Sequence, residues 1–311
     1  MIRPIVLAAI AAVALQGTQD QRPTFRSRTD LITVDVAVTS HGSPVSGLTL
    51  ADFELADNGV RQTIEMVDAE TLPIDLTVVV DTSGSMRRSV DDLKADAQAI
   101  AAMLRPNDRI RLLTFAGQIR ETYALQAPSA DLALDRLAAT GSTSLFDAVA
   151  VALAGVTGTD RRHLVVVLTD GQDTSSVVGR GPLADLSAAA NGVLYAAVSR
   201  PGVLLPPPGV RPPASAEPLN WRHRWMPLAA PPADESPLKD AVENTGGVWD
   251  SVGSIARAPA GVKRALEWFR TAYVLRYRAT GVAAAGWHEL HVKVGRAGEY
   301  DVRARKGYVG Q

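Results

Sequence analysis

The stretch Ile74–Met86 reads IDLTVVVDTSGSM, and the rest of the chain can be interpreted outward from it. Its first half is dominated by Val, Ile and Leu, as expected of a strand that is buried on both faces. A second run of the same kind, His163–Gly171, reads HLVVVLTDG and also delivers an aspartate directly after its apolar residues. Strands of this type belong to mostly parallel sheets that are covered by helices.

Helical and strand patterns alternate around these two runs. Apolar residues at helical spacing predict helices over 90–104, 144–156, 182–190, 238–243 and 261–270. Further strands are expected over 109–115, 119–125, 193–199 and 247–252, with 119–125 at an edge. The alternation predicts an α/β fold with a doubly wound, mostly parallel sheet and helices on both faces, a Rossmann-like arrangement.

The two flanks of this α/β region carry an antiparallel pattern instead. Residues 31–39 alternate apolar and polar side chains, which predicts a half-buried strand. Strands are also expected over 52–56 and 61–67, on either side of Asn58-Gly59, a strong hairpin signal because both residues tolerate positive φ. The end of the chain returns to strand patterns over 272–279, 287–294 and 299–304. Neither flank can bury a dependable core alone, so we expect residues 31–67 to pair with 272–304 in one small antiparallel β module.

The N-terminus has the composition of an export signal. Arg3 precedes the short apolar run Ile5–Leu15, which ends among small residues, and this is typical of a secretory signal peptide. The run is too short to span a bilayer, and no later stretch is apolar enough to do so. We therefore expect a secreted or periplasmic protein without stable membrane insertion after signal cleavage. The alternative is that this segment is an uncleaved anchor or a disordered tail.

These patterns predict four parts along the chain. A signal peptide over 1–17 is followed by an N-terminal β segment over 18–70. The α/β domain covers 71–271 and includes a proline-rich loop insertion over 201–235. A C-terminal β segment covers 272–311.

Composition excludes several classes of function. The chain has 311 residues, with 32 basic and 33 acidic side chains, so it lacks the basic footprint of a nucleic-acid binder. It contains no cysteine, which excludes disulfide scaffolds, thiolate zinc sites, iron–sulfur clusters and cysteine nucleophiles. A metal site in this chain is therefore expected to use oxygen ligands.

Oxygen-bearing side chains follow the two buried strands and a turn between them. Asp81, Ser83 and Ser85 follow the first strand, Thr143 lies in a turn that opens a helix, and Asp170 follows the second strand. Ligands of open α/β sheets bind at the carboxyl ends of the strands, where the strand order reverses. Hydroxyl and carboxylate oxygens suit a hard divalent cation. The alternative is that both aspartates cap helices while the serines lie in turns.

The stretch Ile74–Arg270, with DTSGS, GSTSLFDA and VVVLTDG at these places, resembles a von Willebrand factor type A domain with a metal-ion-dependent adhesion site. The resemblance implies that Mg²⁺, or Mn²⁺ or Ca²⁺, is held by five residues. The serines would bind directly and the aspartate partly through water. These residues are Asp81, Ser83, Ser85, Thr143 and Asp170. The flanks, with VDVAVTSHG near the start and RARKGY near the end, resemble a bacterial subgroup of acidobacterial type.

The ligand set also indicates what such a site would bind. Three of the five residues are neutral hydroxyls, so the cation keeps positive charge and favours an anionic oxygen from outside. We therefore expect an exported, non-catalytic adhesion or scaffold module whose protein partner supplies an Asp or Glu side chain to the metal. A hydrolase that uses the metal to activate water, and a structural subunit of an envelope assembly, are the alternatives.

Two further carboxylates lie beside these loops in the sequence. Asp173 is expected to be a solvated loop residue or a helix cap, and Asp147 to lie in the first turn of its helix, where its charge is favourable. Orienting the metal ligands through hydrogen bonds is the alternative role for both.

Two weaker signals lie elsewhere in the chain. The proline-rich loop carries two tryptophans separated by cations, and these side chains are candidates for a partner surface, with a lid packed onto the domain as the alternative: Trp221, Arg222, Arg224 and Trp225. The run His288–His291 reads HELH on a predicted strand, where His288 and Leu290 share one face and Glu289 and His291 the other. We expect a solvated strand there and not a zinc site.

Overall fold

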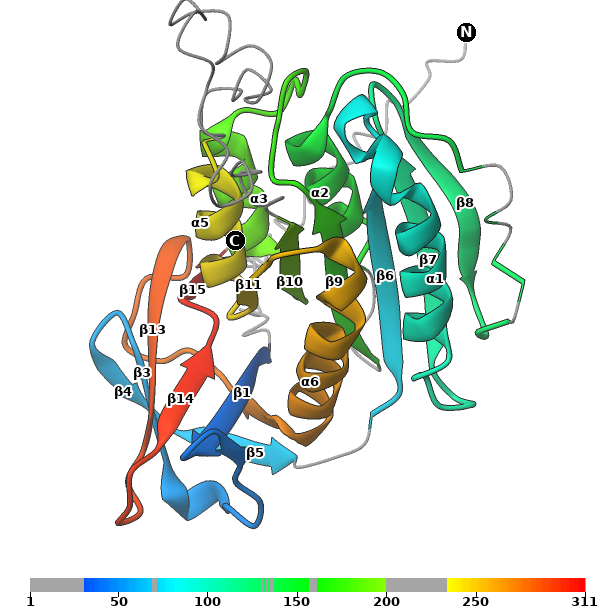
Figure 1. Cartoon of the computed structure of the whole chain (residues 1–311). Helices are drawn as coiled ribbons and strands as arrows, with labels where there is room; N and C mark the ends of the chain where they lie inside the picture. Colours follow the sequence, from blue (N-terminus) through cyan, green and yellow to red (C-terminus); the bar gives the residue numbers. More distant parts are fainter. Residues whose placement is uncertain are drawn as a thin grey trace, which may run out of the picture. The chain divides into compact units, whose positions relative to one another are not determined.

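The computed structural model describes residues 31–68, 72–129, 131, 132, 134, 137–156, 161–199 and 234–310. Within these ranges the chain forms one mixed sheet with its helices and two antiparallel sheets (Figure 1). The predicted signal peptide over 1–17 lies outside the described residues, as do the proline-rich loop up to residue 233 and the candidate partner surface of Trp221, Arg222, Arg224 and Trp225.

The mixed sheet has six strands in the order β11-β10-β9-β6-β7-β8. All neighbours are parallel except the antiparallel edge pair β7–β8. Every residue of β6, β9 and β10 is buried, which explains why their sequences are mostly apolar. The predicted doubly wound sheet and its edge strand are confirmed. The strands are β6 (Ile74–Asp81), β7 (Arg109–Phe115), β8 (Ile119–Gln126), β9 (Arg162–Thr169), β10 (Gly192–Ser199) and β11 (Val248–Val252).

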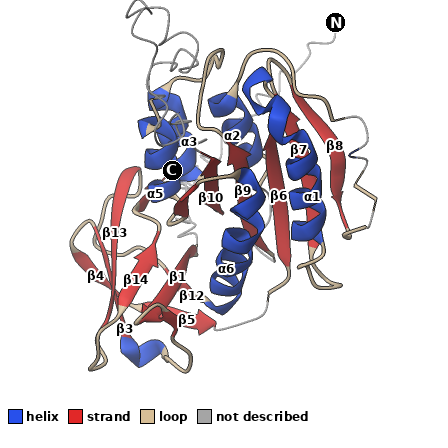
Figure 2. Ribbon diagram, viewed as in Figure 1, coloured by secondary structure: helices blue, strands red, loops and turns tan. Residues whose placement is uncertain are grey.

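Helices cover both faces of this sheet (Figure 2). On one face α1 (Val90–Ala101) and α6 (Ala258–Thr271) pack against alternate β6 residues such as Val78 and Val80. On the other face α2 (Leu145–Ala154), α3 (Arg180–Ala189) and α5 (Ser236–Asn244) pack against Val79 and its neighbours. Two short 3₁₀ helices, η2 (Gly84–Ser89) and η4 (Ile255–Arg257), precede α1 and α6.

The strand order reverses between β6 and β9. The chain places β7 beside one edge of β6 and then crosses to add β9 at the other edge, so the carboxyl ends of β6 and β9 lie next to each other. This is the position at which open α/β sheets bind ligands. It is also where Asp81 and Asp170 are found.

The β module consists of two antiparallel sheets, and each combines strands from both ends of the chain. One has the order β14-β1-β12-β5, with β2 paired to β1; the other has the order β15-β13-β3-β4. The predicted pairing of the two flanks is confirmed. The strands are β1 (Ile32–Ser40), β2 (Ser43–Pro44), β3 (Phe53–Asp57), β4 (Val60–Gln62), β5 (Ile64–Asp68), β12 (Tyr273–Tyr277), β13 (Gly286–Val294), β14 (Asp301–Ala304) and β15 (Gly307–Gly310). The 3₁₀ helix η1 (Leu50–Asp52) leads into β3.

The hairpin between β3 and β4 turns at the predicted dipeptide. Asn58 and Gly59 have φ values of 46° and 78°, the positive angles that a two-residue hairpin of this type requires. Past β4 the chain changes sheet, because β4 pairs with β3 whereas β5 pairs with β12. The strand predicted over 61–67 is therefore two strands in two sheets.

A buried polar cluster lies between the module's sheets. Asp57 is fully buried, and its carboxylate contacts His288 Nδ1 at 2.7 Å and accepts hydrogen bonds from the hydroxyls of Tyr277 and Tyr308 at 2.8 and 2.9 Å. The expected face alternation of β13 is confirmed, since His288 and Leu290 are buried while Glu289 and His291 are exposed. The expectation of a solvated strand is wrong for His288, because the second sheet covers it.

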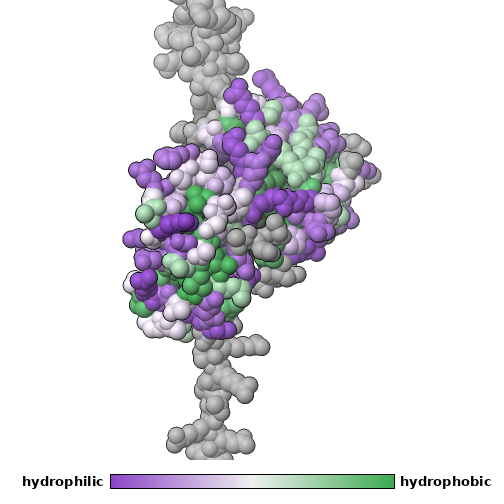
Figure 3. Space-filling model, turned by 90° about the horizontal axis from the view of Figure 1, so that it is seen from below, coloured by the Kyte–Doolittle hydropathy of each residue, from purple (hydrophilic) through white to green (hydrophobic). Residues whose placement is uncertain are grey.

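The surface of the described residues is mixed in character. Seen from below, hydrophilic residues are interspersed with smaller groups of hydrophobic ones (Figure 3). Among the helices of the described residues, none is long and apolar enough to cross a bilayer.

Candidate metal centre

Asp81 is the last residue of β6 and is fully buried. Its Oδ1 accepts a hydrogen bond from the backbone N–H of Ser83 at 2.9 Å, and its Oδ2 accepts one from the hydroxyl of Thr169 at 2.6 Å. The first bond bends the chain back over the strand end and presents the residues that follow. Asp81 therefore caps no helix; it shapes the turn that carries Ser83 and Ser85.

The hydroxyls of Ser83 and Ser85 lie side by side. Their Oγ atoms are 3.0 Å apart, with Ser83 buried and Ser85 exposed on η2. Adjacent ligands of an octahedral Mg²⁺ with bonds of 2.0–2.1 Å are about 3 Å apart. The two hydroxyls thus have the separation that two ligands of one such ion require.

The loop that carries Thr143 is tied to the loop after β6 by backbone hydrogen bonds. The N–H of Gly84 donates to the carbonyl of Gly141 at 3.1 Å, and the N–H of Thr140 donates to the carbonyl of Thr82 at 2.9 Å. Gly141 has a φ of 84°, a conformation that a residue with a Cβ rarely adopts. These bonds hold the buried Thr143 at the same edge of the sheet as Asp81.

The loop after β9 completes the arrangement. The N–H of Thr143 donates to the hydroxyl of Thr174 at 2.8 Å, and the carbonyl of Thr143 accepts from the N–H groups of Thr174 and Ser175 at 2.8 and 3.0 Å. Asp170 is partly exposed, and its Oδ1 accepts a hydrogen bond from the N–H of Gln172 at 3.1 Å. The structure thereby brings all five predicted ligand residues to one sheet edge.

Asp173 and Asp147 join this loop to helix α2. The carboxylate of Asp173 accepts hydrogen bonds from the N–H groups of Leu145 and Phe146 at 2.8 and 3.3 Å, so Asp173 caps the helix as expected. The carboxylate of Asp147 accepts from the N–H groups of Val177 and Val178 at 3.0 and 2.7 Å. Both carboxylates therefore fix the backbone around Thr143.

Asp81 is a buried acid whose pKa is not lowered by any basic side chain among the described residues. Burial raises its pKa to about 6 against the lowering effect of hydrogen bonds from Ser83 and Thr169, and the negative charge of Asp170 adds to the rise. A cation between the two carboxylates would reverse this penalty. The donor set and its charge thus fit a hard divalent ion.

Sequence analysis missed the part played by Thr169. Its hydroxyl donates to Asp81 and accepts from the N–H of Gly171 at 3.0 Å, so it links the two strand ends. In the structure Val80 pairs with Leu168, so Asp81 and Thr169 each directly follow a residue of this pair; the sequence alone does not give this register.

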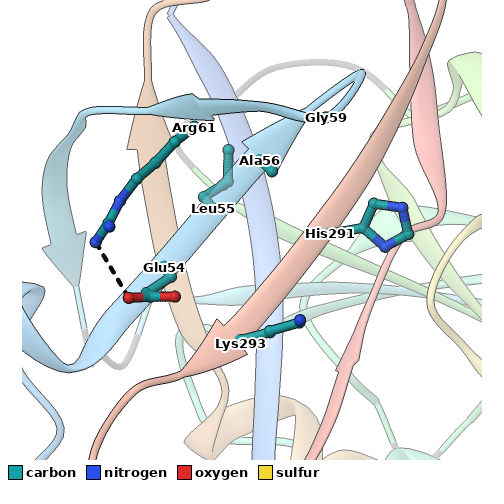
Figure 4. Close-up of a pocket in the computed structure, with 7 residues that line it drawn as sticks. All are labelled: Glu54, Leu55, Ala56, Gly59, Arg61, His291 and Lys293. Atoms are coloured by element: carbon teal, nitrogen blue, oxygen red, sulfur yellow. Dashed lines mark hydrogen bonds and ion pairs between the residues drawn. The ribbon is translucent and has the colours of Figure 1, made fainter.

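A second hollow lies on the β module, on the outer face of β3, β4 and β13 (Figure 4). It has a volume of about 410 Å³ and is lined by Glu54, Leu55, Ala56, Gly59, Arg61, His291 and Lys293. Glu54 and Arg61 form an ion pair at 3.2 Å, but their side chains are 50% and 75% exposed. With charges so well solvated, this hollow lacks the desolvated polar groups of a built site.

Comparisons with known proteins agree with the sequence resemblance. Residues 76–172 match the family model of the von Willebrand factor type A domain. An aerotolerance-related membrane protein from Bacteroides fragilis is 16% identical, with a TM-score of 0.47 over 62% of this chain and 98% of that chain. A von Willebrand factor type A protein from Catenulispora acidiphila is 12% identical, with a TM-score of 0.44 over 92% of this chain and 75% of that chain. No curated protein matches the chain.

The matched segment runs from β6 through β9. It therefore contains the strand-order reversal and the three loops that meet at the candidate metal centre. The expected family resemblance is confirmed, whereas the metal and the bacterial subgroup stay predictions. Residues 76–172 of this chain match the von Willebrand factor type A domain family, and the five candidate ligand residues lie inside this matched part.

Proposed function

We propose that this protein is an exported, non-catalytic binding module that holds a protein partner through a divalent cation. The observation that carries the proposal is the buried carboxylate of Asp81 beside the paired hydroxyls of Ser83 and Ser85. No basic side chain hydrogen-bonds to Asp81, whose partners in the described residues are Ser83 and Thr169. A cation from outside is the simplest source of the missing positive charge.

The ion would be held by Asp81, Ser83, Ser85, Thr143 and Asp170. It would supply a Lewis-acidic position for an oxygen of the partner. Only two of these side chains carry charge, so the bound ion would keep affinity for a carboxylate. The protein's own task is to fix the hydroxyls and keep the loops together, and the hydrogen bonds among the three loops do this.

A binding role is favoured over hydrolysis by the residue types in the three loops. Residues 81–86, 140–147 and 169–176 contain no histidine. His163 lies near the start of β9, at the amino ends of the parallel strands and away from the three loops. Its Nδ1 is 3.9 Å from the carboxylate of Asp75. Hydrolysis of a metal-bound substrate would need a base within hydrogen-bond reach of the attacking water. The aspartates of these loops are either candidate ligands or, for Asp147 and Asp173, acceptors of backbone N–H groups.

Calorimetric titration with Mg²⁺ and Mn²⁺ tests the metal, and a pull-down from an envelope fraction with Mg²⁺ or chelator tests the partner. We expect wild-type protein to bind one ion and to capture a protein only with metal present. The D81A variant should lose both properties and keep its circular dichroism spectrum.

The matched control is D91A, which removes an exposed carboxylate from the first turn of α1 at the same end of the sheet. It should bind metal and partner like the wild type. Metal binding by D81A at wild-type affinity would overturn the metal site, and partner capture that survives chelation would overturn the metal bridge.

A further inference from the structure

Three exposed arginines lie on η2 and near the start of β8, at the carboxyl end of the sheet that carries the candidate metal centre. Arg87 and Arg88 form the last turn of η2, directly after Ser85 and the buried Met86. Arg120 lies near the start of β8, opposite Thr114, and donates a hydrogen bond to the side chain of Gln118 at 3.2 Å. The three cations thus stand on two elements that adjoin the loop after β6.

The short helix η2 sets the direction of one arginine. In a 3₁₀ helix the side chains at positions i and i+3 eclipse each other. Arg88 is three residues after Ser85, so it is on the side of η2 that carries the exposed Ser85 hydroxyl. On the other side of the loop, the carbonyl of Phe115 accepts hydrogen bonds from the N–H and hydroxyl of Thr82, which holds the β7–β8 turn against the site.

These arginines are free of ion pairs within the described residues, unlike other cations at this end of the sheet. Arg180, at the start of α3, pairs with Asp240 at 2.7 Å, and Lys239, in α5, pairs with Glu235 at 3.1 Å. The acids nearest to Arg87 and Arg88 in sequence are Asp91 and Asp92, in the first turn of α1. Their negative charges interact favourably with the positive end of the helix dipole.

The acids of the site loops are also engaged with other groups. Asp147 and Asp173 accept backbone hydrogen bonds, and Asp81 is buried. On the η2 and β8 side, the three exposed arginines therefore outnumber the two exposed acids Asp91 and Asp92 before any ion is bound. This local charge contrasts with a net charge of −1 for the whole chain.

From this arrangement we infer that the partner is an acidic protein segment with more than one carboxylate. This inference rests on the function proposed above, in which one carboxylate of the partner completes the metal site. The neighbouring carboxylates of the segment pair with Arg87, Arg88 and Arg120. Electrostatic complementarity of this kind selects among partners and raises the association rate. Each pair is exposed, so each contributes modestly and is screened by salt.

Fluorescence polarisation with two labelled peptides of equal length tests this inference. One carries a single Asp in a Gly-Ser background, and the other carries the same Asp flanked by two Glu residues on each side. With Mg²⁺ at low salt, the full chain should bind the flanked peptide about 3- to 10-fold more tightly. In the R87Q/R88Q variant this ratio should fall close to one, and it should also fall in the wild type at high salt.

The matched control is K293Q/R303Q, which removes the same charge from exposed positions of the β module. It should keep the wild-type ratio. A ratio near one in the wild type, or a ratio that R87Q/R88Q leaves unchanged, would overturn the inference. Tighter binding of an inorganic polyphosphate of equal charge than of the flanked peptide would overturn the assignment to an acidic protein segment.

The same measurements separate this inference from the proposed function. If the flanked peptide binds equally with Mg²⁺ and with chelator, and R87Q/R88Q still lowers its affinity, the arginines are supported and the metal bridge is overturned. If both peptides need Mg²⁺ but bind equally well, the metal bridge is supported and the arginine selection is overturned.

Discussion

Strand β6 carries a buried aspartate near each end, and the hydrogen-bond donors around the two are different: cationic for Asp75 and neutral for Asp81. Asp75, near the start, is 3% exposed and receives hydrogen bonds from the guanidinium groups of Arg109 and Arg161. Asp81, at the end, is fully buried and receives hydrogen bonds only from neutral groups among the described residues. Burial raises the pKa of both, but the two arginines outweigh it for Asp75, whose pKa is lowered.

This difference shows at which end of the sheet the chain neutralises its own buried carboxylates. At the amino end, cations from the same chain neutralise the buried carboxylates, and Arg270 does the same for Asp108. At the carboxyl end, the described residues give the carboxylate of Asp81 a hydroxyl and a backbone N–H as donors, and no cation. A buried carboxylate kept without a cation is destabilising, so its presence at a strand-order reversal points to a ligand.

The strongest test of the comparison is removal of each aspartate in the presence of chelator. D75A leaves Arg109 and the largely buried Arg161 without their carboxylate and should lower the free energy of unfolding by about 3–4 kcal/mol. D81A removes an unneutralised buried charge and should change it by less than about 1 kcal/mol. Urea unfolding at pH 7 measures both, and equal losses would break the comparison.

The pH dependence of the metal-free protein should be opposite at the two sites. An acid whose pKa is raised in the folded state to about 6 stabilises least above that pH, because the folded protein binds more protons than the unfolded chain between about pH 4 and 6. From pH 3 to pH 7, the free energy of unfolding of D81N relative to wild type should therefore rise by about 3 kcal/mol. For Asp75, whose pKa is lowered, stability is lost only as the pH falls below about 4.

The control for this profile is D96N. Burial raises the pKa of Asp96 to about 7, and its Oδ2 has no hydrogen-bond partner in the described residues. The gain for D96N should continue up to about pH 7, whereas that for D81N should level off above about pH 6. A profile for D81N parallel to wild type would contradict the assignment.

Metal should stabilise only those proteins that keep Asp81 at the carboxyl end of the sheet. At a Mg²⁺ concentration 100 times the dissociation constant, the free energy of unfolding should rise by about 2.7 kcal/mol in the wild type and in D75A, and by nothing in D81A. Urea unfolding with Mg²⁺ or chelator measures this. Stabilisation of D81A by Mg²⁺ would place the ion elsewhere.

The smallest effect is expected from the cap that supports the site. D173A removes the carboxylate that accepts from Leu145 and Phe146 and should cost about 1 kcal/mol of stability. Because the same loop holds Thr143, Mg²⁺ affinity should also fall, by about 10-fold. S176A removes one hydrogen bond to Asp173 and should have a smaller effect on both stability and Mg²⁺ affinity. Unchanged Mg²⁺ affinity in D173A would show that the cap does not support the metal site.

Much of the architecture was predictable from local pattern. The apolar runs of β6 and β9 and the hairpin at Asn58-Gly59 were located correctly, because burial on both faces and positive φ restrict the residue types at each position. The candidate ligand residues were proposed from the ends of the buried strands and from the family resemblance, and their role as ligands stays a prediction. The predicted edge strand β8 is also present.

What the sequence could not indicate is which groups meet across long separations. His288 has the same local pattern on a solvated strand as on a buried one, and only its contact with Asp57, 231 residues away in the chain, distinguishes them. Likewise, the sequence presents Asp75 and Asp81 as similar acids at the two ends of one strand. Hydrophobic periodicity determined the strands, the helices and the sheet edge where the ligand residues gather, because it records burial residue by residue. The tertiary structure alone decided which buried charges have a partner, because that depends on distances between distant segments.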